Sequence, residues 1–221
     1  MHLYKTVNDN IVPSVTTILD VLGNKNIIKW ANILGFKHIV YEEELNRRAN
    51  IGTKIHEILQ CIVDPKFHDT SIKFTSDNEK DFYIKTVERF TNIIKQVNYT
   101  TILTETSFAS DNLGYGGTID WLANINGILI LNDFKSSRQV QDKHLLQLGG
   151  YYNLLKEANY DIQGANIIIV NRYNCKFNPI SLNDLIELGN TFNDIARVYF
   201  DLEKTYKPDS TLYNKIFNIT S

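Results

Sequence analysis

Two segments in the N-terminal half of the chain repeat apolar residues at the spacing of an amphipathic helix. Between residues 42 and 62, the apolar or small positions three and four apart are Leu45, Ala49, Gly52, Ile55, Leu59 and Ile62. The acidic residues at 42–44 suit the positive end of the dipole of that helix. Between residues 78 and 97, the apolar positions are Phe82, Val87, Phe90 and Ile94. We therefore expect helices over both segments.

The stretch PSVTTIL near the N-terminus is ambiguous. Its β-branched residues are typical of a strand. Ser14 could instead cap a short helix that runs through Leu19 and Leu22. The pattern leaves both structures open.

Three segments dense in Thr, Ile, Leu, Trp and Phe predict strands at residues 100–108, 115–125 and 128–135. Asn126-Gly127 joins the second and third strands, and this dipeptide indicates a two-residue hairpin because a type I′ turn needs positive φ at both positions. Counting outward from the turn pairs residue 125 with 128 and residue 120 with 133. The sequence therefore predicts a hairpin with a defined register.

The rest of the chain alternates between helical and strand patterns. A helix is expected over about 140–158, and the short apolar run in GANIIIVNRY is typical of a strand buried on both faces. A last helix from about Ser181 places on one side Leu185, Leu188, Phe192, Ile195 and Tyr199. The order is helices, three strands, a helix, a strand and a helix, which indicates an α/β protein.

Length and composition predict a single globular domain over residues 1–221. The chain has 43% hydrophobic and 22% charged residues, which is enough for one sizeable core. No repeat or Pro/Ser-rich linker divides it. Within this domain we expect a mostly helical part at 1–98, a sheet with a following helix at 99–172, and a C-terminal helix within 173–221.

Charge, hydropathy and cysteine content exclude several classes of protein. A net charge of -2 does not create the strongly basic field of a histone or a non-specific DNA coat, so any nucleic-acid affinity must come from local patches. The apolar runs ILIL and IIIV are too short for a membrane span or a signal peptide, so we expect a soluble cytoplasmic protein without a membrane partner. Cys61 and Cys175 have no CxxC spacing, so a disulfide framework, a zinc site and an iron–sulfur cluster are not expected.

Two aspartates face each other in the predicted hairpin. Its register places Asp120 across from Asp133 with Cβ atoms about 4.5–5.5 Å apart. Like charges in that position require a shared proton or a cation, and a divalent metal is the natural compensator. Lys135 lies on the same face as Asp133, whereas Phe134 points the other way into apolar packing. Two carboxylates and an ammonium group are thus expected on one patch.

This set of groups suits hydrolysis of a phosphodiester. Carboxylates hold Mg²⁺ or Mn²⁺, the metal acidifies a bound water, and a lysine positions or deprotonates the nucleophile. The alternative is a surface salt bridge beside a solvated aspartate. Spacing alone leaves both interpretations open.

The segment GTIDWLANINGILILNDFKSS, followed by QLGGYY, resembles the PD-(D/E)xK nuclease superfamily. Within it, the segment is similar to RecB-like exonucleases, whose motifs run GxxD, DxK and QxxxY. PSVTTIL, the Trp30 region and GTKIH also resemble the branch that contains phage recombination exonucleases and the mitochondrial genome maintenance exonuclease. The similarity spans roughly residues 12–155, and the first aspartate follows Gly-Thr-Ile instead of proline, as is common in this branch.

The resemblance implies a restriction-endonuclease-like αβββαβ core, with a mixed central sheet flanked by helices. It implies a DNA exonuclease that uses one or two Mg²⁺ or Mn²⁺ ions in recombination, repair or replication, and it allows for a phage-encoded protein with a recombination or replication partner. By the same resemblance, Asp120, Asp133 and His56 are metal ligands and Lys135 orients the attacking water. Glu105 matches an acid that relatives often carry near the metal. The four-cysteine iron–sulfur cluster of some relatives cannot be built from two cysteines.

Further residues are candidates for contacts around this site. Gln147 and Tyr151 match QxxxY and are four residues apart on one helix, so we expect Gln147 to bond Lys135 or a ligand and Tyr151 to contact a phosphate or base, or to be a core tyrosine. The interior Gly149-Gly150 suggests a close approach of the backbone to another element. Residues expected to contact the DNA backbone, or else to be solvated, are Arg47, Arg48, Lys54, Ser136 and Ser137.

Three functions are open at this point. The preferred one is a metal-dependent DNA exonuclease acting on single-stranded ends or flaps. The second is a binding module that grips DNA ends or a partner without hydrolysis. The third is a structure-specific endonuclease on the same fold.

Overall fold

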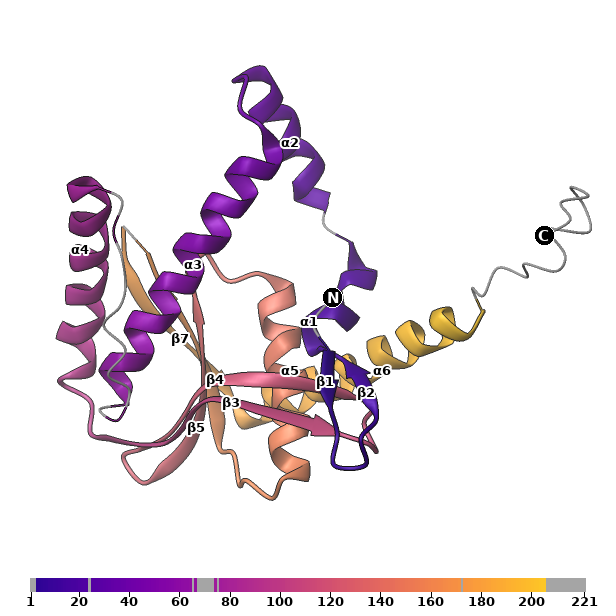
Figure 1. The fold of residues 1–221 in the computed structure, drawn as a ribbon. Coiled ribbons are helices and arrows are strands. Elements are labelled where there is room, and N and C mark those ends of the chain that lie inside the picture. Colours follow the sequence, from indigo (N-terminus) through magenta and orange to yellow (C-terminus); the bar gives the residue numbers. More distant parts are fainter. Residues whose placement is uncertain are drawn as a thin grey trace, which may run out of the picture.

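A five-stranded mixed sheet forms the centre of the computed structural model, which describes residues 3–23, 25–64, 66, 74, 76–171 and 173–205 (Figure 1). Its strands lie in the order β3-β4-β5-β6-β7, and only β5 and β6 pair in parallel. Their bounds are Tyr99–Ser110 (β3), Tyr115–Ile125 (β4), Ile128–Lys135 (β5), Gly164–Val170 (β6) and Cys175–Ser181 (β7). The predicted α/β class with a mixed sheet flanked by helices is confirmed.

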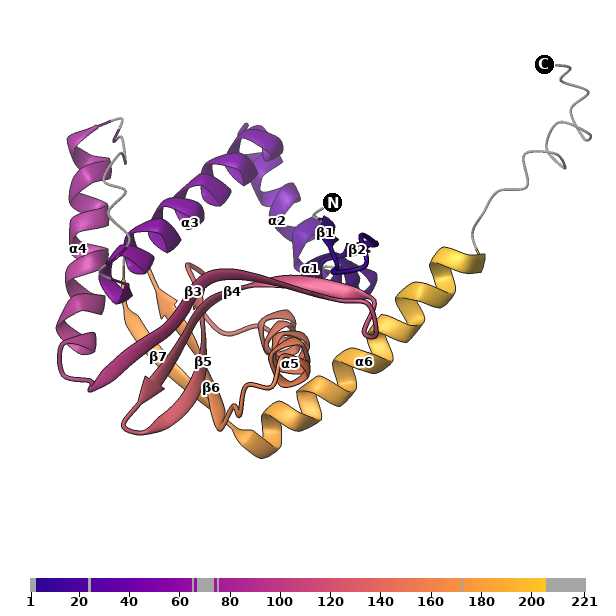
Figure 2. The ribbon, with the colours of Figure 1, turned by 60° about the horizontal axis from the view of Figure 1, so that its bottom comes forward.

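Helices cover both faces of this sheet (Figure 2). One face packs against α1 (Val15–Ile18), α5 (Asp142–Glu157) and α6 (Leu182–Thr205). The other face packs against α3 (Tyr41–Val63) and α4 (Asp77–Ile94). Among the described residues, no helix has both the length and the apolar character needed to cross a membrane.

The β4–β5 hairpin and β6 agree with the sequence patterns. Asn126 and Gly127 both have positive φ, and Ile125 pairs with Ile128 as the turn requires. In β6, Ile167 and Ile169 pack on the α5 face, whereas Ile168 and Val170 pack on the α3 face. The strand is therefore apolar on both sides because helices cover both faces of the sheet.

Ser14 resolves the ambiguity in PSVTTIL in favour of a helix. Its side chain accepts a hydrogen bond from the amide of Thr17 at 2.9 Å and caps α1. A 3₁₀ helix, η1 (Leu19–Leu22), continues the turn. Val15 and Ile18 are completely buried against the sheet, so this short helix is held mainly by packing.

The structure contains elements that the sequence patterns did not predict. A small hairpin of β1 (Leu3–Lys5) and β2 (Ile11–Pro13) precedes α1, and α2 (Lys25–Phe36) precedes α3. The segment expected to hold only a C-terminal helix begins with β7, whose exposed and half-buried residues alternate as in an edge strand. Residues 206–221 of that segment lie outside the described residues.

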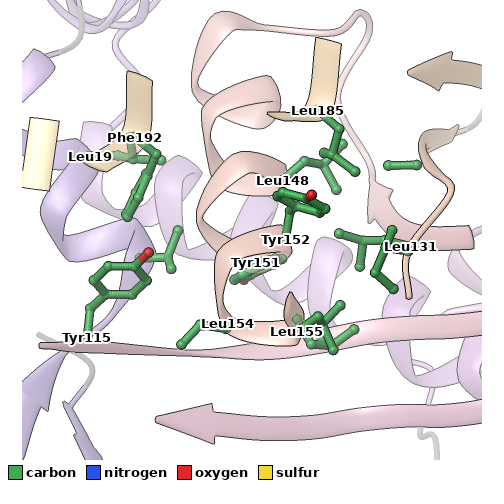
Figure 3. Packing of buried hydrophobic residues seen from close by; sticks show 14 of the residues in the cluster. Leu19, Tyr115, Leu131, Leu148, Tyr151, Tyr152, Leu154, Leu155, Leu185 and Phe192 are labelled. Carbon is green, nitrogen blue, oxygen red and sulfur yellow. The ribbon is translucent and has the colours of Figure 1, made fainter. Parts of the chain in front are cut away.

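The glycine pair in α5 allows this helix to contact its neighbours closely. A Cβ added at Gly149 would overlap the backbone of Leu188 in α6, and one at Gly150 would crowd Val15. Figure 3 shows Phe192 beside α5, and Leu154 on the side of the helix towards the strands. The expectation of a close backbone approach is thus confirmed, and its cause is helix packing.

Gly149→Ala is expected to lower the free energy of unfolding by about 1–3 kcal/mol, because the added methyl group overpacks the α5–α6 contact. Urea unfolding followed by circular dichroism measures the change. Gly35→Ala in α2 is the matched control, since nothing lies within 4 Å of the added Cβ and the helix should gain about 0.5–1 kcal/mol. Equal effects of the two substitutions would contradict the close contact.

Candidate metal centre

The candidate site forms where β4 and β5 separate. Their ladder ends at the pair Trp121 and Asn132, one step before Asp120 and Asp133. At the next position, the backbone N–H of Phe134 donates to Asp120 Oδ2 at 2.8 Å. The hairpin register is as predicted along the whole ladder, and beyond its end the carboxylate of Asp120 bonds the backbone of β5.

Glu105 approaches Asp120 from the neighbouring strand. Paired residues of β3 and β4 flank it, with Thr104 opposite Trp121 and Thr106 opposite Ile119. Glu105 itself has φ of 41°, an uncommon left-handed conformation for a glutamate inside a strand. Such strained backbone occurs preferentially at functional sites, and here it accompanies a carboxylate next to a second carboxylate.

His56 on α3 completes a group of three ligand-type side chains. Its Nδ1 lies 3.5 Å from Asp120 Oδ2, and its ring contacts Phe134 edge-on. One ligand atom each from His56, Glu105 and Asp120 all lie within 4.8 Å of one another. Helix α3 can approach the sheet closely here because Gly52 has no side chain, and a Cβ there would lie 3.3 Å from Ser136 Oγ.

These three residues fit a divalent cation. One imidazole nitrogen and two carboxylates leave coordination positions for water or substrate on an ion such as Mn²⁺ or Mg²⁺. The pocket that contains them has a volume of about 390 Å³ and is also lined by Gly52, Thr53, Glu57 and Gln60. There is thus room for a phosphate group beside the ligands. Figure 2 shows α3 on the opposite side of the β3–β4 pair from α5.

Asp133 lies close to this group, and the charges of Asp120 and His56 act on it. Its side chain is completely buried, and Lys135 Nζ contacts its two carboxylate oxygens at 2.9 and 2.7 Å. Gln147 Nε2 donates to Asp133 Oδ1 at 3.3 Å and to Tyr151 Oη at 2.7 Å. Asp133 is thus held in an ion pair with Lys135, and its place among the metal ligands stays a prediction.

The electrostatics of the site follow from burial among several carboxylates. The pKa of Glu105 is raised to about 7, mainly by partial burial and to a smaller extent by the charge of Asp120. Burial also raises the pKa of Asp133, although Lys135 opposes this shift. Burial would lower the pKa of Lys135, but Asp133 and then Asp120 outweigh it and raise that pKa above its usual value. Lys135 is thus an ammonium group at neutral pH, which favours a positioning role over that of a base.

Tyr151 is a core tyrosine, one of the two alternatives that the sequence left open. It is buried in the core, its hydroxyl accepts a hydrogen bond from Gln147, and its ring occupies the space that a Cβ at Gly117 would need. Burial raises its pKa well above 10. Tyr151 therefore supports Gln147 from within the core, and Gly117 of the GxxD motif makes room for its ring.

The basic residues of α3 lie outside the metal pocket. Arg47 and Arg48 each donate a hydrogen bond of 2.7 Å to the carboxylate of Glu44. These bonds lower the pKa of Glu44 to about 2, and the bond from Arg47 has the larger effect. Arg48 also lies over the ring of Trp30. Lys54 approaches the ring of Tyr83 in the α4 layer, with Nζ 5.8 Å from the ring centroid.

A second pocket of about 320 Å³ adjoins the site beyond Lys135. Its polar lining includes Ser136, Ser137 and Arg48, and its apolar lining includes Ile51 and Phe82. Of the residues predicted to contact DNA, the structure thus gathers two serines and one arginine here. The serine hydroxyls lie on the segment that follows β5, as the DxK motif suggested.

His144, which no sequence motif indicated, is held neutral beside this pocket. Its Nδ1 accepts a hydrogen bond from the backbone amide of Gln141 and caps α5. Burial, and then the ammonium group of Lys135, lower its pKa to about 4. Protonation at Nδ1 would therefore break the cap.

The stability of the protein should depend on His144 at acidic pH. Below pH 6.5 the unfolded chain binds a proton on this histidine that the folded protein does not, so stability falls as the pH approaches about 4. From pH 7 to pH 5, the free energy of unfolding measured in urea should fall by about 2 kcal/mol more in the wild type than in His144→Gln. His38→Asn, at an exposed histidine, should behave like the wild type. Parallel losses in all three proteins would contradict this role of His144.

Gln60 is the other residue of the site that the motifs missed. It lies four residues after His56 on the same helix face and is buried, which is unusual for glutamine. Its i, i+4 spacing from His56 was the one available signal.

Neither a protein-family model nor a curated protein sequence matches the chain.

Proposed function

We propose that this protein is a metal-dependent DNA nuclease of the PD-(D/E)xK type, acting as an exonuclease on single-stranded ends or flaps. The observation that carries the proposal is the convergence of His56, Glu105 and Asp120, with the ion pair of Asp133 and Lys135 directly behind them. These residues come from the GTKIH, GxxD and DxK motifs and from the preceding strand. Their element order, α4-β3-β4-β5-α5-β6, agrees with the αβββαβ order of the superfamily.

Each residue has a role in this proposal. His56, Glu105 and Asp120 would hold the cation, which supplies Lewis acidity for activating a water and for neutralising charge on the phosphate. Lys135 keeps an ammonium group next to the reacting centre, where it orients the attacking water or stabilises charge on the phosphorane. Gln147 fixes the carboxylate of Asp133, and Asp133 in turn fixes Lys135.

The surroundings of the pocket support an anionic substrate. Carboxylates line it, so a phosphodiester can enter only with a cation that neutralises them. The adjoining pocket offers Arg48 and the two serines to a neighbouring phosphate. The preference for DNA ends, and for a recombination or replication partner, rests on the resemblance to RecB-like exonucleases.

The test is degradation of DNA labelled at the 5′ or the 3′ end, single-stranded and double-stranded, with Mn²⁺ or with EDTA. We expect loss of label that requires Mn²⁺, and no cleavage of circular single-stranded DNA. Cleavage of the circle would indicate an endonuclease instead. A gel shift that persists in EDTA, with every DNA intact in Mn²⁺, would indicate the non-catalytic binding module.

A further inference from the structure

A third pocket adjoins the one that contains Lys135. It has a volume of about 350 Å³ and is lined by Arg138, Asn171, Tyr173 and Asn174. Asn171 lines both pockets, so the two meet at this residue. Arg138 follows Lys135 by three residues, which keeps their Cα atoms within about 11 Å of each other. The third pocket therefore lies close to the groups proposed for hydrolysis.

Hydrogen bonds hold the loop that carries Tyr173 in place. The side chain of Asn171 is buried and donates to the backbone oxygen of Ser137 at 2.7 Å. Its side-chain oxygen accepts from the backbone amides of Tyr173 at 2.9 Å and Asn174 at 3.2 Å. These bonds tie the loop between β6 and β7 to the segment that follows β5. The backbone of Tyr173 is therefore positioned by the fold itself.

The third pocket combines an open aromatic ring with a cation. Tyr173 is 70% exposed, so a ligand can reach its ring. Arg138 is also exposed, and among the described residues no carboxylate pairs with it, whereas Glu44 pairs with Arg47. A single exposed aromatic residue is ordinary, but this one lies beside a free guanidinium group and near a site for phosphodiesters. An aromatic face and a cation together match a nucleotide, whose base stacks and whose phosphate is anionic.

We propose that Arg138 and Tyr173 form a subsite for a nucleotide of the DNA strand near the bond that is cut, where Tyr173 stacks on the base and Arg138 binds a phosphate. This inference rests on the nuclease function proposed above. Bases are available for such stacking when they are unpaired, so the subsite favours single-stranded DNA. Stacking uses the face of the base and not its hydrogen-bonding edge, so the subsite accepts any of the four bases.

Tyr173→Ala tests the stacking. The affinity for a labelled single-stranded oligonucleotide in Ca²⁺, measured by fluorescence anisotropy, should fall about tenfold. Tyr173→Phe retains the ring, so its affinity should stay within about twofold of the wild type. An oligonucleotide of abasic units has no bases to stack, so it should bind the wild type and Tyr173→Ala equally. The urea midpoint should not change in either variant, because the side chain is exposed.

Arg138→Ala tests the phosphate contact. Its affinity for the same oligonucleotide should fall at low salt. The plot of log K against log[salt] should become less steep by about 0.7, the contribution of one phosphate in a single strand. Arg197→Ala is the matched control, because Arg197 is an exposed arginine of α6 outside the three pockets, and its slope should equal that of the wild type.

Three results would each overturn the subsite: equal losses in Tyr173→Ala and Tyr173→Phe, an equal loss of Tyr173→Ala on the abasic oligonucleotide, or an unchanged salt slope in Arg138→Ala. If the wild type binds the oligonucleotide in Ca²⁺ but cleaves nothing in Mn²⁺, the nuclease function fails, while the variants still test the subsite. A wild type that binds no single-stranded DNA overturns the subsite, and cleavage of double-stranded DNA in Mn²⁺ would then still support the nuclease.

Discussion

Lys135→Ala is expected to abolish metal-dependent DNA hydrolysis and to destabilise the metal-free protein. In the proposed function the ammonium group lies next to the reacting centre, so its loss should lower kcat/KM by at least about 10³-fold. The same change leaves the carboxylate of Asp133, which is 0% exposed, without its cation. Breaking a buried ion pair in this way costs about 3–5 kcal/mol of stability. End-labelled DNA assays and urea unfolding measure the two effects.

A double variant separates the chemistry from the stability. Asp133→Asn combined with Lys135→Met removes both charges, so the free energy of unfolding should recover most of the loss while hydrolysis stays absent. If the activity of Lys135→Ala stays within tenfold of the wild-type activity, Lys135 takes no part in the reaction. An unchanged urea midpoint in Lys135→Ala would show that the buried ion pair does not stabilise the fold.

Asp120→Asn is expected to remove metal binding while leaving the fold almost unchanged. An asparagine still offers an oxygen to the amide of Phe134, so the free energy of unfolding should change by less than about 1 kcal/mol. It loses the carboxylate that lies closest to His56 and Glu105, so the affinity for Mn²⁺ should fall at least about 100-fold. Hydrolysis should fall with it, by about 10³-fold or more.

Calorimetric titration of Mn²⁺ into each protein tests this expectation directly. Asp9→Asn is the control, because Asp9 is an exposed aspartate of the N-terminal hairpin and asparagine tolerates its positive φ. An Mn²⁺ affinity of Asp120→Asn equal to that of Asp9→Asn would exclude Asp120 as a ligand. Hydrolysis should then be attributed to another group of side chains.

Local patterns in the sequence determined much of the fold. The Asn126-Gly127 turn set the register of the β4–β5 hairpin, because only positive φ at both positions closes a two-residue loop of this kind. Helical periodicity indicated α3, α4, α5 and α6 because each buries one apolar stripe. The edge strand β7 was missed because its residues are mixed in polarity and carry no turn signal as clear as Asn-Gly.

The sequence predicted which residues belong to the site better than it predicted how they are arranged. His56, Glu105, Asp120 and Lys135 do converge, since strand parity and helix spacing constrain where each side chain points. The roles of Asp133 and Tyr151 could not be read in the same way. Both are buried at contacts of α5 with the sheet, Asp133 against Gln147 and Tyr151 against Gly117, and these contacts join segments distant in sequence.

The sequence by itself thus determined the elements, the hairpin register and the identity of most charged groups at the site. Only the tertiary structure decided that the β4–β5 ladder ends before Asp120, that Asp133 pairs with Lys135, and that Gln60 is buried at the pocket. Periodicity reports which face a residue occupies within its own element. Which groups meet across elements depends on how helices pack on a twisted sheet, and that packing is set by contacts distant in sequence.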